Sequence, residues 1–265
     1  MNYWTQASIE LANQRDYLDQ LFRVYPMSHN LNREMPERLS LQLQGLFDKK
    51  DNKALIKLLL QQELFPVKDS YVAYLKRDSG AVERNPQTIN RLAGAVYDLG
   101  YDEMIKKMTM PKETNRQIGP LFKNWIRSKA LGFEVTEDTE NFRTADENLV
   151  LNASDAAMEE FARKYLGYDH NKGLDFIAKV NGTYVIGEAK FLTDFGGHQN
   201  AQFADAIATL RTKLKKTPYI VKKIAILDGV LYIPGKHKMM LEMEGAEGDE
   251  VILSALLLRD YLYTL

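Results

Sequence analysis

Residues 173–190 read Gly-Leu-Asp-Phe-Ile-Ala-Lys-Val-Asn-Gly-Thr-Tyr-Val-Ile-Gly-Glu-Ala-Lys, with runs rich in β-branched and aromatic residues on either side of Asn181-Gly182. Asn-Gly is a dipeptide that strongly favours a two-residue hairpin loop, because both turn residues adopt positive φ angles there. The stretch therefore predicts antiparallel strands over residues 173–180 and 183–190, joined by a type I′ turn.

The turn also determines which residues of the two strands face each other. A two-residue loop pairs Val180 with Thr183. The same register places Asp175 directly opposite Glu188, with their Cβ atoms about 4.5–5.5 Å apart. Lys190 projects from the same face as Glu188, because strand side chains alternate between the two faces. The hairpin therefore predicts two carboxylates and one ammonium group clustered on one face of a sheet.

The charges of this cluster allow two interpretations. Facing carboxylates repel each other and call for a neutralising partner, and a hard divalent cation such as Mg²⁺ accepts oxygen ligands of this kind. Alternatively, Lys190 pairs with both acids in a surface salt-bridge cluster. The acid-x-lysine pattern also occurs at residues 48–50 and 51–53, within a helical pattern. Only residues 188–190 are expected on a strand opposite another carboxylate.

The sequence after the hairpin predicts further strands and helices around the same sheet. An amphipathic helix follows, and its surface is expected to carry Lys215 and Lys216. The nearly all-apolar residues 219–227 predict a central strand that is buried on both faces. Residues 230–233 and 251–253 are expected to form two more strands, the second one before a C-terminal helix.

The sequence before the hairpin has mainly helical periodicity. Apolar residues recur at three- and four-residue spacing from Ile9 to about Lys107. Within this stretch, Asn85-Pro86 predicts the start of a helix that ends near Gly100. That helix suits either a helix-turn-helix that enters a DNA groove or an ordinary amphipathic helix. Another amphipathic helix is expected over residues 121–131.

Composition excludes several classes of protein. The chain has 265 residues, 45% of them hydrophobic, which is enough for a sizeable core and excludes a mainly disordered protein. The absence of cysteine excludes disulfide scaffolds, cysteine-ligated metals and thiol nucleophiles. Residues 1–14 lack the features of a signal peptide, and the longest near-continuous apolar run, 251–258, is far short of the ~20 residues that span a bilayer. We therefore expect a cytoplasmic protein without a membrane partner.

Charge is nearly balanced overall but unevenly distributed. The formal net charge is −1, so a nucleic acid would have to bind a local basic surface. Residues 101–130 contain seven basic and three acidic residues, and residues 205–223 contain six basic and one acidic. Between them, residues 133–161 contain nine acidic residues and one basic. This pattern suits a polyanion groove beside a cation site, although solvated helix faces would produce it too.

These features resemble the PD-(D/E)xK nuclease core of type II restriction endonucleases. The resemblance rests on Asp175, on Glu188-Ala189-Lys190 at the end of an apolar strand, and on the helices before and after the hairpin. Leu174 stands where the family name has proline. The resemblance covers about residues 113–265 and implies an α/β fold, with a restriction-endonuclease-like mixed β-sheet core flanked by helices. It also implies that residues 1–112 are a helical recognition or dimerisation region.

The resemblance further implies roles for the clustered side chains. Asp175 and Glu188 would bind Mg²⁺, the carbonyl of Ala189 would complete the coordination, and Lys190 would orient and activate the attacking water. These roles agree with the charge that develops during phosphodiester hydrolysis. Enzymes of this kind often add an acid from an upstream helix. Glu160 is the candidate here, although a glutamate at that position also suits a solvated helix face.

DNA contacts are expected on either side of this cluster. The loop after residue 190 contains two glycines and several amide side chains, which suit close approach to the major groove and contacts to adenine edges. A helix cap would use the same residues, and His198 of this loop is a weaker candidate for a catalytic base. Basic residues elsewhere suit phosphate contacts. The expected DNA-binding residues are Gln199, Asn200, Gln202, Arg116, Lys215 and Lys216.

The sequence thus predicts a Mg²⁺-dependent type II restriction endonuclease that cleaves double-stranded DNA at a short specific site. A homodimer is expected, because a symmetric site requires two equivalent active sites. One alternative is a nuclease of the same fold that acts in DNA repair or recombination. The other is a non-catalytic helix-turn-helix regulator that binds DNA through the helix beginning at Pro86.

Overall fold

The structure is a computed structural model that describes residues 1–26, 34–110, 118–170 and 172–265. The chain forms two compact units, a core unit of Met1–Met27 with Glu113–Leu265, and a helical unit of Ser28–Lys112. The boundary between the units after residue 112 is at the expected position. The start of the chain, which was expected in the helical region 1–112, belongs to the core unit instead. Tyr17, Leu21 and Val24 are buried in the main hydrophobic cluster of the core unit, and their burial holds this segment there.

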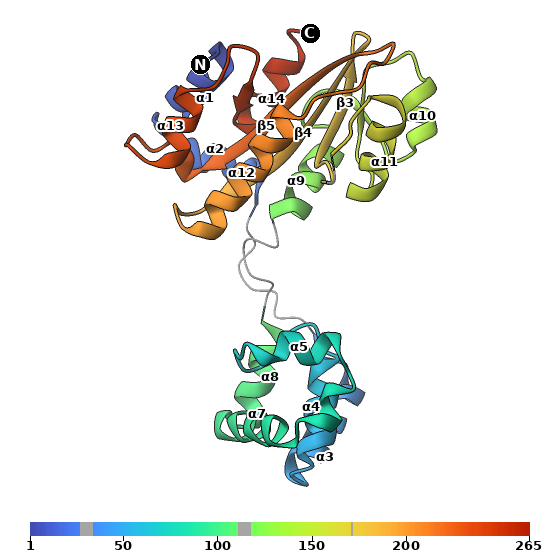
Figure 1. The fold of residues 1–265 in the computed structure, drawn as a ribbon, viewed down its shortest axis with the longest axis vertical. Helices are drawn as coiled ribbons and strands as arrows, with labels where there is room; N and C mark the ends of the chain where they lie inside the picture. The colour runs from blue at the N-terminus through green and yellow to red at the C-terminus, as the bar shows by residue number, and fades with distance from the viewer. Residues whose placement is uncertain (27–33, 111–117, 171) are drawn as a thin grey trace. The chain divides into compact units, whose positions relative to one another are not determined.

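The core unit is built on a six-stranded mixed sheet with strand order β1-β2-β3-β4-β5-β6 (Figure 1). β3 runs antiparallel to both β2 and β4, whereas the pairs β1–β2, β4–β5 and β5–β6 are parallel. The strands are β1 (Glu134–Thr136), β2 (Leu149–Leu151), β3 (Phe176–Val180), β4 (Thr183–Leu192), β5 (Ile220–Gly229) and β6 (Val251–Leu253). This mixed sheet flanked by helices agrees with the predicted fold class.

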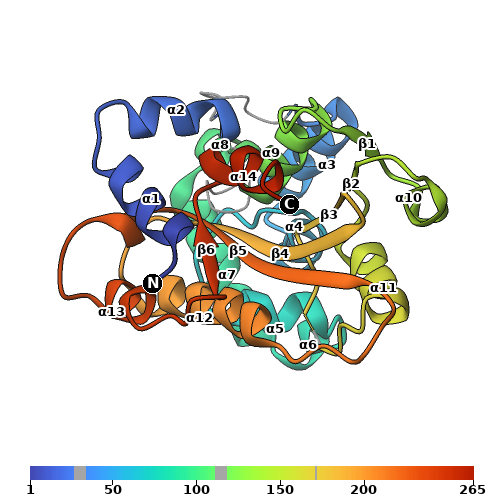
Figure 2. The ribbon, with the colours of Figure 1, turned by 90° about the horizontal axis from the view of Figure 1, so that it is seen from above.

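Helices cover both faces of the sheet. They are α1 (Tyr3–Ala12), α2 (Tyr17–Val24), α9 (Ile118–Arg127), α10 (Thr139–Thr144), α11 (Asp155–Tyr165), α12 (Gly197–Arg211), α13 (Lys238–Glu244) and α14 (Ala255–Leu262). Figure 2 shows α9 and α14 on one side of β4 and β5, with α11 and α12 on the other. In the part of the chain that the structure describes, no helix has the length and apolar character that a bilayer crossing requires.

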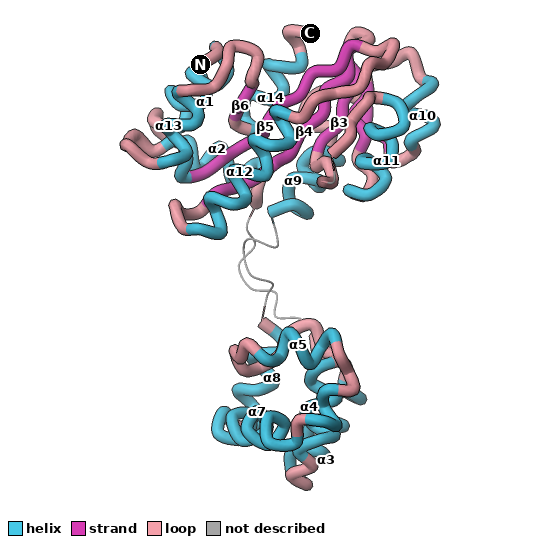
Figure 3. The backbone as a smooth tube through the Cα atoms, in the orientation of Figure 1, coloured by secondary structure: helices cyan, strands magenta, loops and turns pink. Residues whose placement is uncertain are grey.

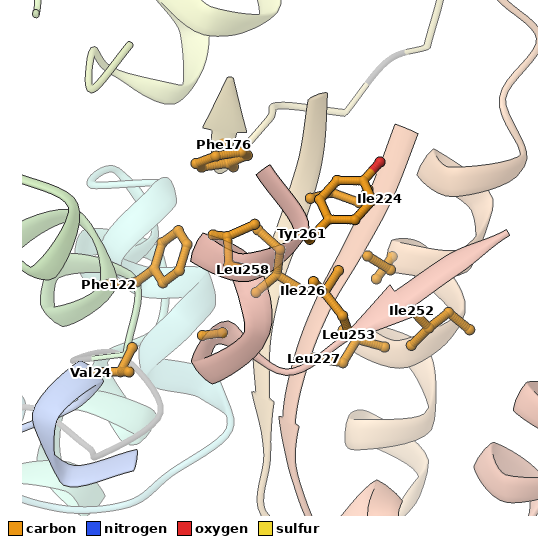
Figure 4. Close-up of a cluster of buried hydrophobic side chains, with 14 of the residues drawn as sticks. Val24, Phe122, Phe176, Ile224, Ile226, Leu227, Ile252, Leu253, Leu258 and Tyr261 are labelled. Carbon is orange, nitrogen blue, oxygen red and sulfur yellow. The ribbon is translucent and has the colours of Figure 1, made fainter. Parts of the chain in front are cut away.

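The main core lies between the middle of the sheet and these helices. Ile224, Ile226 and Leu227 of β5 are fully buried and contact apolar side chains on both faces. Figure 4 shows them with Phe122 of α9 and Leu258 of α14. Two-sided burial explains why this strand has a nearly continuous apolar sequence instead of an alternating one, as predicted.

The helical unit has its own hydrophobic cluster. Its described part consists of helices joined by loops (Figure 3). Its helices are α3 (Glu37–Asp48), α4 (Asn52–Leu60), α5 (Tyr71–Arg77), α6 (Ala81–Arg84), α7 (Pro86–Leu99) and α8 (Tyr101–Thr109). α7 starts at Pro86 and stops before Gly100, as the sequence predicts. The unit is inserted between α2 and α9, and the rings of Tyr25 and Phe122, beside the two points of insertion, are stacked with centroids 6.5 Å apart.

Three local predictions differ from the structure. Residues 230–232 form a short 3-10 helix and not a strand, because Gly229 turns the chain with φ 101° and the adjacent Leu231 and Tyr232 are both buried. The short strands β1 and β2 were not expected within the acidic segment. α12 ends at Arg211, so Lys215 and Lys216 lie in the loop that follows it instead of on its surface.

Candidate active site

The β3–β4 hairpin has the predicted register. Asn181 and Gly182 have φ angles of 48° and 76°, as a type I′ turn requires. Val180 pairs with Thr183, and the pairing continues residue by residue back to Phe176 at the start of β3. Gly187 lies so close to β5 that an added Cβ would be 2.5 Å from the carbonyl oxygen of Ile224. The residue beside the acidic pair therefore has to be small.

Asp175 lies just before β3 and is held by the facing strand. Its backbone N–H donates to the carbonyl of Gly187 at 3.1 Å, which extends the ladder by one step. Its carboxylate oxygen Oδ2 accepts hydrogen bonds from the Ala189 N–H at 3.0 Å and from the Lys190 ammonium at 2.7 Å. The side chain keeps 22% exposure. Asp175 is therefore fixed in orientation while part of its carboxylate still faces solvent.

Glu188 is more deeply buried, with 4% exposure. Its Oε1 accepts a hydrogen bond from the Thr209 hydroxyl of α12 at 2.7 Å. Its Oε2 lies 3.4 Å from the Lys190 ammonium. The two oxygens of this carboxylate thus face different partners, one in the interior and one in the charged cluster.

Lys190 joins the two acids. Burial alone would lower the pKa of its ammonium group, but the charges of Asp175 and Glu188 outweigh burial and hold the pKa above its ordinary value. The structure therefore brings together the three side chains that the register predicts, with Lys190 paired to both acids. One cation between two carboxylates leaves a net charge of −1, and this donor set and charge fit a divalent cation.

The residues that the structure describes supply no further acid for this cluster. Among the described residues, no group of three or more histidine, aspartate or glutamate side chains is arranged to hold a metal ion. Glu160, the candidate from the upstream helix, is exposed on α11. Its surroundings there are those of a solvated helix face.

The loop after β4 differs from its predicted role at one residue. Gln199 is 2% exposed, and its Oε1 accepts the Thr193 N–H at 3.2 Å, so its side chain closes the loop. This burial disfavours the predicted DNA contact of Gln199. Asn200 donates to the Phe195 carbonyl, and Gln202 contacts His198 at 3.1 Å. Both of these amides remain partly exposed.

The basic residues predicted to contact DNA fall in different places. Lys215 is 72% exposed and pairs with Asp169 at 2.7 Å. Lys216 is also exposed, in the same loop. Arg116 lies outside the described residues. Nothing in the structure joins these lysines directly to the carboxylate cluster.

Sequence reasoning missed the polar side chains behind Glu188. Thr209 and Tyr168 are each 1% exposed. One feature of the sequence could have revealed Thr209. It lies within a stripe of apolar residues on α12, and a polar residue in such a stripe needs a buried hydrogen-bond partner. The identity of that partner depends on the packing of α12 against β4.

A second buried polar cluster was also missed. Asp228 of β5 lies on the sheet face opposite Lys190 and accepts hydrogen bonds from the Tyr25 hydroxyl at 2.9 Å, the Ala255 N–H at 3.2 Å and the Ser254 hydroxyl. Burial raises the pKa of Asp228 to about 6, although these hydrogen bonds act in the opposite direction. The cluster fastens α2 and α14 to β5.

Comparison with protein-family models gives a match over residues 2–265, to the model described as Tsp45I type II restriction enzyme. Comparisons with curated proteins and with solved structures give no match. The match to the family model covers both the core unit and the helical unit.

Proposed function

The chain belongs to the Tsp45I type II restriction enzyme family, and we propose that Asp175, Glu188 and Lys190 form its Mg²⁺-dependent cleavage site. Membership makes the protein a site-specific deoxyribonuclease that acts on double-stranded DNA. The observation that carries the site assignment is the convergence of Asp175 and Glu188 on Lys190 across the β3–β4 hairpin.

The donor set fits Mg²⁺. Asp175 offers a partly exposed carboxylate, and Glu188 offers Oε2 on the same side of the hairpin. Mg²⁺ is usually bound by one or two carboxylates together with water and substrate phosphate, so a large cage of acids is not needed. We include the carbonyl of Ala189, between the two charged residues, as a further ligand. Mg²⁺ would supply charge stabilisation at the phosphate and would favour deprotonation of the attacking water.

Lys190 would orient the reacting groups. Its ammonium is charged at neutral pH and lies between the two acids, on the side where a phosphate would approach. Its partial burial strengthens its interaction with a phosphate oxygen, because water screens the charge less there. Asp175 and Glu188 would hold this ammonium in place until the substrate enters.

We propose a homodimer as the functional form. In a short symmetric DNA site the two strands have the same sequence and are related by a two-fold axis. A two-fold dimer supplies one active site for each strand. We assign recognition or dimerisation to the helical unit, whose separate hydrophobic cluster allows it to fold as a module. Of the alternatives, the non-catalytic regulator is disfavoured by membership of an enzyme family.

Cleavage of plasmid DNA tests this proposal. The parent protein should produce discrete fragments with Mg²⁺ and none in EDTA. Glu188→Ala and Lys190→Ala should each abolish cleavage while DNA binding, measured by gel shift, stays within a few-fold. Glu134→Ala and Lys129→Ala are matched controls from an exposed ion pair and should cleave normally. Parent-like cleavage by the Glu188 or Lys190 variant would remove these residues from the mechanism.

A further inference from the structure

One side of Glu188 is in contact with a buried hydroxyl. The Thr209 hydroxyl donates to Oε1 at 2.7 Å, and both residues are at most 4% exposed. A buried carboxylate is costly unless hydrogen bonds satisfy it, so this contact is a condition for keeping Glu188 in the interior. Water has little access to take the place of the hydroxyl.

The contact also determines how the carboxylate is oriented. With Oε1 hydrogen-bonded to α12, the other oxygen, Oε2, is directed to the side of Lys190, 3.4 Å from its ammonium. Rotation of the carboxylate away from this orientation would break the hydrogen bond from Thr209, except for a half-turn, which only exchanges two equivalent oxygens. The free oxygen is therefore preorganised for a ligand on the Lys190 side.

We propose that Thr209 is a positioning residue for the divalent metal site. This inference rests on the proposed role of Glu188 as a metal ligand. Groups that orient a metal ligand typically change metal affinity by about 10–100-fold when they are removed. Thr209 itself touches neither the metal nor the DNA in this scheme.

Thr209→Val tests the inference, because valine keeps the branched shape and removes only the hydroxyl. We expect the Mg²⁺ concentration for half-maximal cleavage to rise about 10–100-fold. The rate at saturating Mg²⁺ should stay within a few-fold of the parent rate. Thr209→Ser keeps the hydroxyl and should restore the parent response. Thr183→Val places the same substitution at another buried threonine of the core unit and should leave the Mg²⁺ response unchanged.

A second readout does not depend on activity. Mg²⁺ should raise the melting temperature of the parent protein, and Thr209→Val should need about 10–100-fold more Mg²⁺ for the same rise. Thr209→Ala also removes the hydroxyl and should shift both responses in the same direction, and it provides the test if Thr209→Val does not fold.

The outcomes separate this inference from the proposed function. If Glu188→Ala abolishes cleavage but folded Thr209→Val responds to Mg²⁺ like the parent in both measurements, the positioning role is wrong and the active site stands. A response that serine fails to restore would also overturn it, because the hydroxyl would not be the cause. If Glu188→Ala cleaves like the parent, the proposed site falls and the role of Thr209 falls with it.

Discussion

Asp175→Asn separates a metal site from a structural salt bridge. The substitution keeps the size of the side chain and removes its charge. Without metal, the carboxylate accepts hydrogen bonds from Lys190 at 2.7 Å and from the Ala189 N–H at 3.0 Å, and asparagine can keep only the second of these with its full geometry. The substitution should therefore lower both the stability of the metal-free protein and its response to Mg²⁺.

The magnitude in EDTA follows from two opposing effects. A hydrogen bond to a charged group contributes about 1.5–3 kcal/mol, and partial exposure of this pair places it near the lower limit. Removing the repulsion between Asp175 and Glu188 returns up to ~1 kcal/mol. The net loss in free energy of unfolding should be about 1 kcal/mol, or about 2–4 °C in melting temperature for a chain of this size.

Mg²⁺ should reveal the larger difference. At a concentration about 100 times its dissociation constant, a ligand that binds only the folded state stabilises it by about 2.7 kcal/mol. The parent should gain most of this, corresponding to about 5–10 °C, and the variant should gain much less because one carboxylate ligand is missing. Cleavage by the variant should be lost.

Thermal melts of both proteins in EDTA and over a Mg²⁺ titration provide the assay. Asp205→Asn is a matched control, because Asp205 pairs with Lys172 at 2.9 Å on the exposed surface of the same unit. That variant should show the parent Mg²⁺ shift and a smaller loss in EDTA. Equal Mg²⁺ shifts for the parent and Asp175→Asn would refute the reasoning, because the carboxylate would then serve only the salt bridge.

Two further predictions concern other parts of the core unit. Lys215→Ala combined with Lys216→Ala should weaken DNA binding equally on all sequences and reduce the salt dependence by up to ~0.9 log unit for each lost phosphate contact; an unchanged slope in binding titrations would assign both lysines to the solvated surface. Asp228→Asn should change the pH dependence of stability. Because the folded-state pKa of Asp228 is raised to about 6, its protonated form stabilises the fold at low pH, and this contribution is lost as pH rises through 6. The parent should lose roughly 2 kcal/mol relative to the variant between pH 4 and 7, as measured by denaturant unfolding, and a constant difference would contradict the assignment.

The geometry of the candidate site was predictable from a local rule. Asn181-Gly182 determines the turn, the turn determines the register, and the register brings Asp175 opposite Glu188. Lys190 follows from the alternation of strand side chains. The repulsion between the two acids was also predictable, but its relief by Lys190 in the metal-free protein depends on side-chain rotamers that a sequence pattern does not contain.

Local sequence patterns do not predict features that depend on packing between residues far apart in the sequence. α2 was assigned to the helical region, because an amphipathic helix does not reveal which core its apolar face joins. The burial of Gln199 depends on a loop that folds back to Thr193. Thr209 donates to Glu188, which lies 21 residues away in the sequence. Asp228 accepts from Ser254, which lies 26 residues away. Such contacts require the three-dimensional arrangement of the elements.

The insertion of the helical unit between α2 and α9 has a consequence for evolution. The stacked rings of Tyr25 and Phe122 keep the two insertion points adjacent within the core unit. Because these ends are adjacent, a segment that folds around its own hydrophobic cluster can occupy this position without separating the elements that it joins. A lineage can therefore lengthen, shorten or exchange this segment by recombination at little cost to the catalytic scaffold. If the segment reads DNA, as we propose, new target sequences can arise while the cleavage chemistry is inherited intact.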